Sequence, residues 1–191
     1  MVDMDTRDVG LSNEVIEVGA SIPMQDVIHY KSHWTIEKYE GDFHSPDEAK
    51  IAGVSPYEVL EFDGNLLLNE GITNGLQLWT TTGTPTAWAT GNAYIGVGDN
   101  SQAAANTDTG LIAATNIKYN AMTNSSYPSV TGQTATWQST FASADANFHW
   151  QEITVSTTSL NSGINLNRKV QDMGTKASGT SWVASLAITL S

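Results

Sequence analysis

The sequence contains no cysteine and no long apolar run, and both absences narrow the classes of protein to which the chain can belong. Without cysteine it cannot be a disulfide-stapled scaffold, hold a metal through thiolates or use a cysteine nucleophile. No apolar stretch approaches the ~20 residues that a membrane-spanning helix requires. The first ten residues, MVDMDTRDVG, are acidic and lack an apolar segment. We therefore expect neither a signal peptide nor a membrane partner.

Basic residues are also scarce. The chain has 8 Lys and Arg against 20 Asp and Glu, a net charge of −12. The first 70 residues hold fifteen acids and four bases, a net of −11, and the rest hold five acids and four bases. Because nucleic-acid binding depends on Lys and Arg contacts to phosphate, we expect no nucleic-acid partner. The acidic first third is expected either to face water or to meet a basic partner surface.

Strand-like patterns dominate the chain, and 191 residues suit one domain with an arm. Residues 134–158 hold two runs rich in Thr, Val, Ile, Trp and Phe, which we interpret as two antiparallel strands that bury aromatic rings. The cleanest alternation is at 182–190, and further candidates are 34–39, 57–62 and 93–98. With turn residues between these runs, the sequence predicts an all-β fold, a β-sandwich or jelly-roll-like antiparallel domain.

Two segments are expected to contain helix. Residues 65–79 place Leu68, Ile72, Leu76 and Trp79 at helical spacing, with Asn65 as a possible cap. Residues 111–122 are expected to contain a helical turn or two. Residues 1–30 show weak periodicity, and we interpret them as an extended N-terminal arm that precedes a β-sandwich domain over 31–191, with a disordered tail as the alternative.

Two motifs could hold a ligand, and each has a simpler structural interpretation. The stretch Gly96-Val-Gly98-Asp-Asn-Ser101 begins like a nucleotide-binding loop but lacks the third glycine, which favours a turn at the end of a strand. His29 and His33 lie four apart without the glutamate of a zinc-protease motif, so we expect surface histidines. No metal or cofactor is predicted.

The candidates for catalysis are carboxylates and one histidine. Asp145, His149 and Glu152 lie close in sequence, but alternation on a strand separates His149 from Glu152, so a half-buried Glu152 that accepts backbone hydrogen bonds is the preferred interpretation. Asp99, Asp108 and Asp145 could converge for glycoside cleavage, with Trp79, Trp88 and Tyr94 stacking on sugar. We predict that the protein is not an enzyme and has no catalytic residues.

The candidate interface residues come from two parts of the chain. The second half has a small basic cluster, which we expect to form surface salt bridges or to dock on an acidic neighbour such as the first third of another copy. The arm contributes apolar residues that could rest on a partner. Together these residues are Val15, Ile16, Val18, Ile22, Arg168, Lys169 and Lys176.

Several segments, taken in order, carry a family resemblance. They are FDGNLLLNEG at 62–71, AYIGVGD at 93–99, WQSTF at 137–141, ANFHWQE at 146–152, LNRK at 166–169 and GTK at 174–176. The ordered set, which spans roughly residues 57–191, resembles virion structural proteins of tailed bacteriophages, including capsid decoration (cement) proteins. Residues 1–30 lie outside the resemblance.

The resemblance implies a non-enzymatic β protein of the virion that decorates the outer surface of the head and stabilises contacts between major capsid protein subunits. The implied partners are the major capsid protein and copies of the chain itself, as a trimer or dimer. An alternative is a tail or head-fibre component that binds a host-surface glycan through exposed Trp and Tyr. A third hypothesis, an enzyme such as a depolymerase, is the least favoured.

Overall fold

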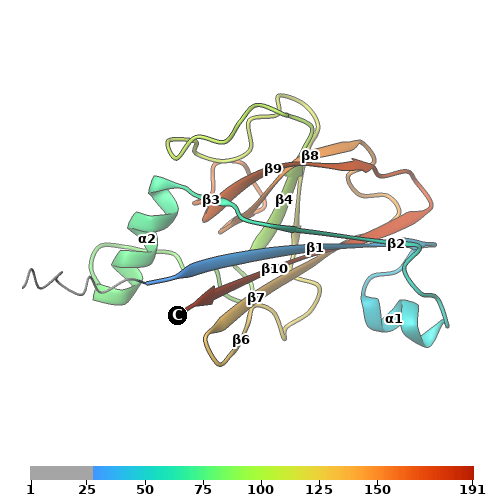
Figure 1. Ribbon diagram of the computed structural model, residues 1–191, viewed down its shortest axis with the longest axis horizontal. Helices are drawn as coiled ribbons and strands as arrows, with labels where there is room; N and C mark the ends of the chain where they lie inside the picture. Colours follow the sequence, from blue (N-terminus) through green and yellow to red (C-terminus); the bar gives the residue numbers. More distant parts are fainter. Residues whose placement is uncertain (1–27) are drawn as a thin grey trace, which may run out of the picture.

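The computed structural model describes residues 28–191 and consists of two antiparallel sheets packed face to face (Figure 1). The first sheet has the order β2 (Glu58–Asp63), β1 (Tyr30–Glu40), β10 (Thr180–Leu190), β7 (Thr134–Phe141) and β6 (Ser129–Thr131). The second has the order β3 (Leu66–Leu67), β9 (Asn167–Thr175), β8 (His149–Ser156), β4 (Tyr94–Gly98) and β5 (Ile117–Ala121). Two helices, α1 (Pro46–Ile51) and α2 (Asn69–Thr80), complete the domain. The predicted all-β sandwich is confirmed.

The core lies between the sheets and follows the alternation of the longest strands. Trp34 and Ile36 on β1 pair with Leu186 and Ala184 on β10, and all four side chains are fully buried. Side chains at every second position of an extended strand point to one face, so each strand delivers an apolar row to the core. The strands predicted at 34–39 and 182–190 are therefore confirmed, and each extends a little further than the pattern indicates.

The connection between β1 and β2 carries α1, which lies at the opposite end of the molecule from α2 (Figure 1). Ser45 caps α1 by accepting a 3.1 Å hydrogen bond from the Glu48 N–H. Buried Ala49 packs with Tyr39 and Val183, so this short helix covers part of the outer face of the first sheet. β1 and β2 pair antiparallel, so they form a hairpin whose long connection contains α1.

The two strands at 134–158 do not pair with each other, which corrects the simplest interpretation of the sequence. β7 belongs to the first sheet and β8 to the second, and their aromatic rings meet across the core. The ring centroids of Phe141 and Trp150 are 4.7 Å apart, and those of Trp150 and Trp182 are 4.8 Å apart. Apolar alternation identifies the buried face of each strand. The same alternation results whether the neighbouring strand in sequence is hydrogen-bonded in the same sheet or packs from the opposite sheet.

An irregularity in β8 decides which face Glu152 occupies. The pairing of β8 with β9 shifts register between Trp150 and Glu152. Ile153 and Val155 join the core together with Trp150, although simple alternation would place them on the opposite face. Glu152 instead contacts the loop that covers the outer face of the second sheet.

Two local predictions are wrong. Residues 111–122, expected to include helical turns, form a loop followed by β5. The helix expected from Asn65 begins at Asn69, and Asn65 does not cap it but accepts a 2.5 Å hydrogen bond from the Tyr30 hydroxyl. Within residues 28–191 no helix is long and apolar enough to cross a membrane.

Candidate functional site

Two features of the sandwich concentrate unusual side chains, and the first is a buried ion network on the outer face of the second sheet. Glu152 is completely buried and accepts hydrogen bonds from the backbone N–H groups of Ile112 at 3.1 Å and Ala113 at 2.8 Å. Its carboxylate also accepts a 2.7 Å bond from Nε of Arg168, which is equally buried. The prediction that Glu152 accepts backbone hydrogen bonds is confirmed, and its burial is greater than expected.

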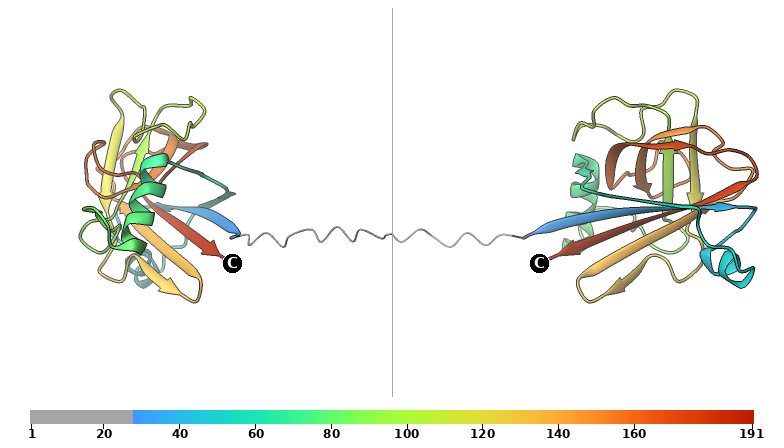
Figure 2. Two further views of the ribbon diagram at one scale, coloured as in Figure 1. Left: turned by 90° about the vertical axis from the view of Figure 1, so that its left-hand side faces the viewer. Right: turned by 45° about the vertical axis from the view of Figure 1, so that its right-hand side comes forward.

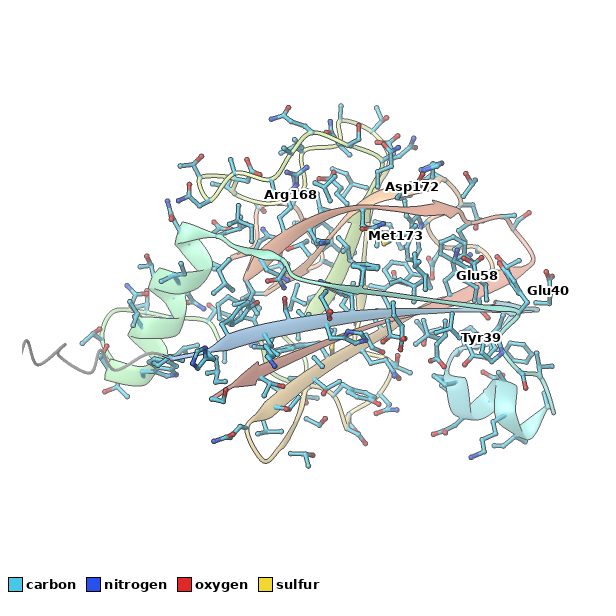
Figure 3. The ribbon with its side chains drawn as sticks, in the orientation of Figure 1. Tyr39, Glu40, Glu58, Arg168, Asp172 and Met173 are labelled. Atoms are coloured by element: carbon cyan, nitrogen blue, oxygen red, sulfur yellow. The ribbon has the colours of Figure 1, made fainter. Side chains whose placement is uncertain are left out.

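Arg168 uses all of its guanidinium nitrogens in this network. Nη1 lies 2.9 Å from the Asp108 carboxylate, and Nη2 donates a 3.0 Å bond to the carbonyl of Gln102. Figure 3 shows Arg168 below the loops that cross this side of the sandwich. A guanidinium suits this position because its planar fork can satisfy several acceptors in fixed directions. The network therefore fastens the 99–116 loop to the sheet.

A polar cluster of uncharged side chains continues the same attachment. The side chain of Asn161 accepts from the Leu111 N–H at 2.9 Å and donates to the Leu111 carbonyl at 2.7 Å. The Tyr119 hydroxyl donates a 2.6 Å bond to the same Asn161. Burial raises the pKa of Tyr119, which keeps the phenol neutral and able to donate. Each of these partly buried groups has a protein partner.

Asp145 and His149, two of the residues considered for catalysis, have separate partners. Asp145 forms a 2.9 Å ion pair with Lys118, whereas His149 lies 2.8 Å from Asp172 on β9. Burial raises the pKa of Asp145, but the ion pair and a hydrogen bond from Asn120 outweigh it and hold that pKa below its ordinary value. Neither residue shares a contact with Glu152, so the structure does not bring the three together as a catalytic group.

The remaining sugar-site candidates are also dispersed. Asp99 accepts a 2.6 Å bond from the Asn116 side chain, whereas Asp108 pairs with Arg168. Trp88 is buried, and its indole donates to the carbonyl of Ile164. Tyr94 is half-buried, whereas Trp79 is 70% exposed.

The histidine pair at 29 and 33 does not form a metal site. His33 on β1 lies 2.7 Å from Asp63 on the neighbouring strand, and this hydrogen bond raises the pKa of the imidazole. Among residues 28–191 no three potential metal ligands come together. The Gly96–Ser101 motif lies where β4 ends at Gly98, which agrees with the interpretation as a turn at the end of a strand.

Burial corrects the expected basic interface. Arg168 and Lys176 are 0% and 1% exposed, so they cannot present charge to a neighbouring molecule. Lys176 donates to the Ala142 carbonyl at 2.8 Å and to the Asn147 side chain at 2.9 Å, and burial lowers its pKa to about 8. Lys169, which is half-buried, donates to the Asp63 carbonyl. Val15, Ile16, Val18 and Ile22, the other predicted interface residues, lie outside the described residues.

The second unusual feature is an apolar groove of about 970 Å³ at the end of the sandwich where α2 lies. Figure 2 shows α2 at this end, beside the start of β1 and the end of β10. The walls come from α2, from β6 and β7, and from the last residues of β10, and the lining is almost entirely apolar. We call this surface the end groove.

The helical stripe predicted from the sequence forms one wall of the end groove instead of packing into the core. Leu68 is fully buried, but Ile72, Leu76 and Trp79 are 45%, 51% and 70% exposed. Gly71 allows the helix to approach the second sheet, because a Cβ at this position would overlap the Leu166 carbonyl oxygen.

The opposite wall of the end groove is also uncovered. Val130 on the short edge strand β6 is 75% exposed, and Leu190 at the end of β10 is 36% exposed. Ile28, which precedes β1, also lines the groove and is exposed. The described part of the chain therefore leaves apolar side chains open to water on both walls, and such patches mark sites of contact with another molecule.

Comparison with known proteins does not add a family to these observations. No protein-family model, no curated protein and no solved structure matches this chain.

Part of the end groove is absent from the candidates that were identified from the sequence. The groove residues on β6 and β10, Val130 and Leu190, were not identified as candidates, because strand alternation assigns a face without showing whether that face is covered. The sequence signal on this side of the groove is the apolar stripe of α2, which predicted an amphipathic helix and did not indicate a groove.

Proposed function

We propose that the protein is a non-enzymatic structural component of a tailed-bacteriophage virion that decorates the outer surface of the head. The end groove is the observation that carries this proposal, because it gives the sandwich a large apolar surface suited to protein contact. The ordered resemblance of residues 57–191 to virion structural proteins is the reason for proposing a phage virion as the assembly that the protein joins. In this role the end groove contributes contacts within the shell of decorating molecules that covers the major capsid protein lattice.

The rest of the sandwich supports a role that depends on shape. Three tryptophans at 34, 150 and 182 fill the core, and the ion network fastens the longest loop to the second sheet. A stiff body loses little conformational freedom when it docks, so more of its contact energy remains as affinity. On a lattice, weak contacts repeat around each molecule, and avidity adds to the affinity of each contact.

Two experiments test the proposal. Electron microscopy of particles with and without this protein should show density lost from the head shell, and loss from the tail would contradict the decoration role. The paired change Leu76→Ser and Trp79→Ser should weaken attachment to the particle at least about tenfold, the scale of losing one hot spot. A matched control is Ile51→Ser, which changes an 89% exposed residue on α1 at the far end of the molecule and should leave attachment unchanged.

A second candidate function, binding of a host-surface glycan, is favoured by Trp79 alone. An exposed indole beside a groove can stack on the apolar face of a sugar. The groove lining offers few polar side chains, however, and sugar hydroxyls require hydrogen-bond partners. A glycan array decides between the two functions, since a ligand whose binding is lost in Trp79→Ser would favour the second.

A further inference from the structure

The end groove needs an occupant, and the sequence that precedes β1 contains a suitable segment. Residues 1–27 lie outside the described residues; we call them the leader. The leader contains Val15, Ile16, Val18 and Ile22 within eight residues, and this is its densest apolar segment. A groove lined by aliphatic and aromatic side chains gains stability by removing such residues from water, at about 25 cal/mol per Å² of apolar area.

The leader joins the sandwich at the mouth of this groove. The backbone N–H of His29 donates to the carbonyl of Ser191 at 2.6 Å, and the His29 carbonyl accepts from the Ser191 N–H at 3.0 Å. Ile28 lines the groove itself. Every copy therefore carries its apolar segment a few residues from its own groove mouth. Fully extended, 27 residues span roughly 90 Å, which is enough to reach the groove of a neighbouring molecule.

We propose that the end groove binds residues 15–22 from the leader of a second copy, an inference that rests on the decoration role because a lattice holds copies side by side. On such a lattice a neighbour's leader is present at an effective concentration on the order of mM, comparable to that of the groove's own leader. The two sources differ in what they connect. The chain's own segment would cover the groove within one molecule, whereas a neighbour's segment joins two molecules, which is the contact that the decoration role requires.

In this exchange each molecule inserts its leader into one neighbour and binds the leader of another neighbour in its own groove. One leader fills one groove, so the apolar walls at Leu76 and Val130 are covered on every member of a closed ring. The acidic residues Glu14 and Glu17 flank and interrupt the apolar segment, and they can remain at the groove's open side, in water. The lining has few polar groups that could accept a buried carboxylate.

The absence of cysteine from the chain makes a crosslinking test clean. Full-length Ile16→Cys and full-length Leu76→Cys are purified separately, mixed at about 1 mM, the effective concentration assumed for the lattice, and treated with a short bis-maleimide. A covalent dimer should form at least about tenfold more than in a mixture of Ile16→Cys with Ile51→Cys, whose cysteine lies on α1. The tolerance of the linker removes the need to know the register of the segment.

A second arm shows that apolar contact drives the pairing. Adding Val15→Asp to the Ile16→Cys partner should abolish the dimer, because a carboxylate would enter an apolar groove. Adding Val9→Asp, a matched change outside the segment, should leave the dimer unchanged.

Each remaining outcome overturns the exchange. If the double variant Ile16→Cys/Leu76→Cys crosslinks only within single chains, the groove takes its own leader. If neither arrangement crosslinks, the groove serves a different molecule. Particle imaging decides the decoration role independently, so failure of the exchange and failure of the proposed function are distinguishable.

Discussion

Replacing Glu152 by glutamine should cost about 3–5 kcal/mol of unfolding free energy, although the two side chains have nearly the same shape. The carboxylate accepts two backbone N–H groups and the Arg168 Nε at distances between 2.7 and 3.1 Å, and both charged groups are inaccessible to water. A glutamine turns one of its amide N–H groups toward a donor and leaves that buried donor unpaired, at about 1–3 kcal/mol. It also removes the charge that compensates Arg168.

The complementary change Arg168→Met should cost a similar amount, because it leaves Glu152 as an uncompensated buried charge. The loss of unfolding free energy in the double variant should be smaller than the sum of the two single losses, by at least about 1 kcal/mol. The reason is that the second change removes the buried charge that the first change leaves unpaired. Urea unfolding followed by tryptophan fluorescence measures all three variants. The six tryptophans provide the signal.

A surface pair supplies the control for this prediction. Asp172 lies 2.8 Å from His149 at similar hydrogen-bonding distance, but its side chain is 70% exposed. Asp172→Asn should change stability by less than about 1 kcal/mol. If Glu152→Gln costs no more than this control, the network does not hold the loop and the reasoning from burial is wrong.

Three further predictions concern single positions. Gly71→Ala should destabilise the fold by about 1–3 kcal/mol, because the added methyl group overlaps a backbone carbonyl. Gly75→Ala should stabilise it by up to about 1 kcal/mol, because no atom lies within 4 Å of the added Cβ. Urea unfolding should therefore give changes in unfolding free energy of opposite sign for the two variants. Lys176 has a pKa of about 8 in the folded protein and about 10.5 in the unfolded chain, so the unfolded chain binds more protons between these pH values. The free energy of unfolding should therefore rise as the pH increases from 8 to 10. Lys176→Met should remove this pH dependence. The folded pKa of His33 is raised, so its stabilising effect is complete below pH 6.5 and is lost as pH rises through the folded pKa; an NMR titration should place its midpoint above 6.5, and Asp63→Asn should lower it.

The fold class was predictable because each long strand carries its own evidence. The alternation at 182–190 and at 34–39 depends only on neighbouring residues, and the structure buries the faces that it indicates. Pairing was not predictable, since β7 and β8 are adjacent in sequence but lie in different sheets. Partner choice depends on contacts between distant segments, such as β1 with β10, which no local pattern records.

The candidate site was predictable only in part, for the same physical reason. The role of Glu152 as a backbone acceptor followed from its place on an apolar strand. Arg168 appeared to be a surface cation because its partners at 102, 108 and 152 are far from it in sequence. The stripe on α2 was recognised as apolar. Whether it meets a core or an open groove depends on what covers it, and a periodic pattern contains no such information.

The pairing of β1 with β10 has a consequence for biosynthesis. Tyr30 is matched to Leu190, so the centre of the first sheet joins two segments that are synthesised far apart in time. At ribosomal speeds of about 5–20 residues per second, β1 must wait on the order of ten seconds or longer before its main partner emerges. During that interval the buried face of β1, with Trp34 and Ile36, has no finished sheet to join. The nascent chain is thus expected to rely on chaperones until β10 leaves the exit tunnel.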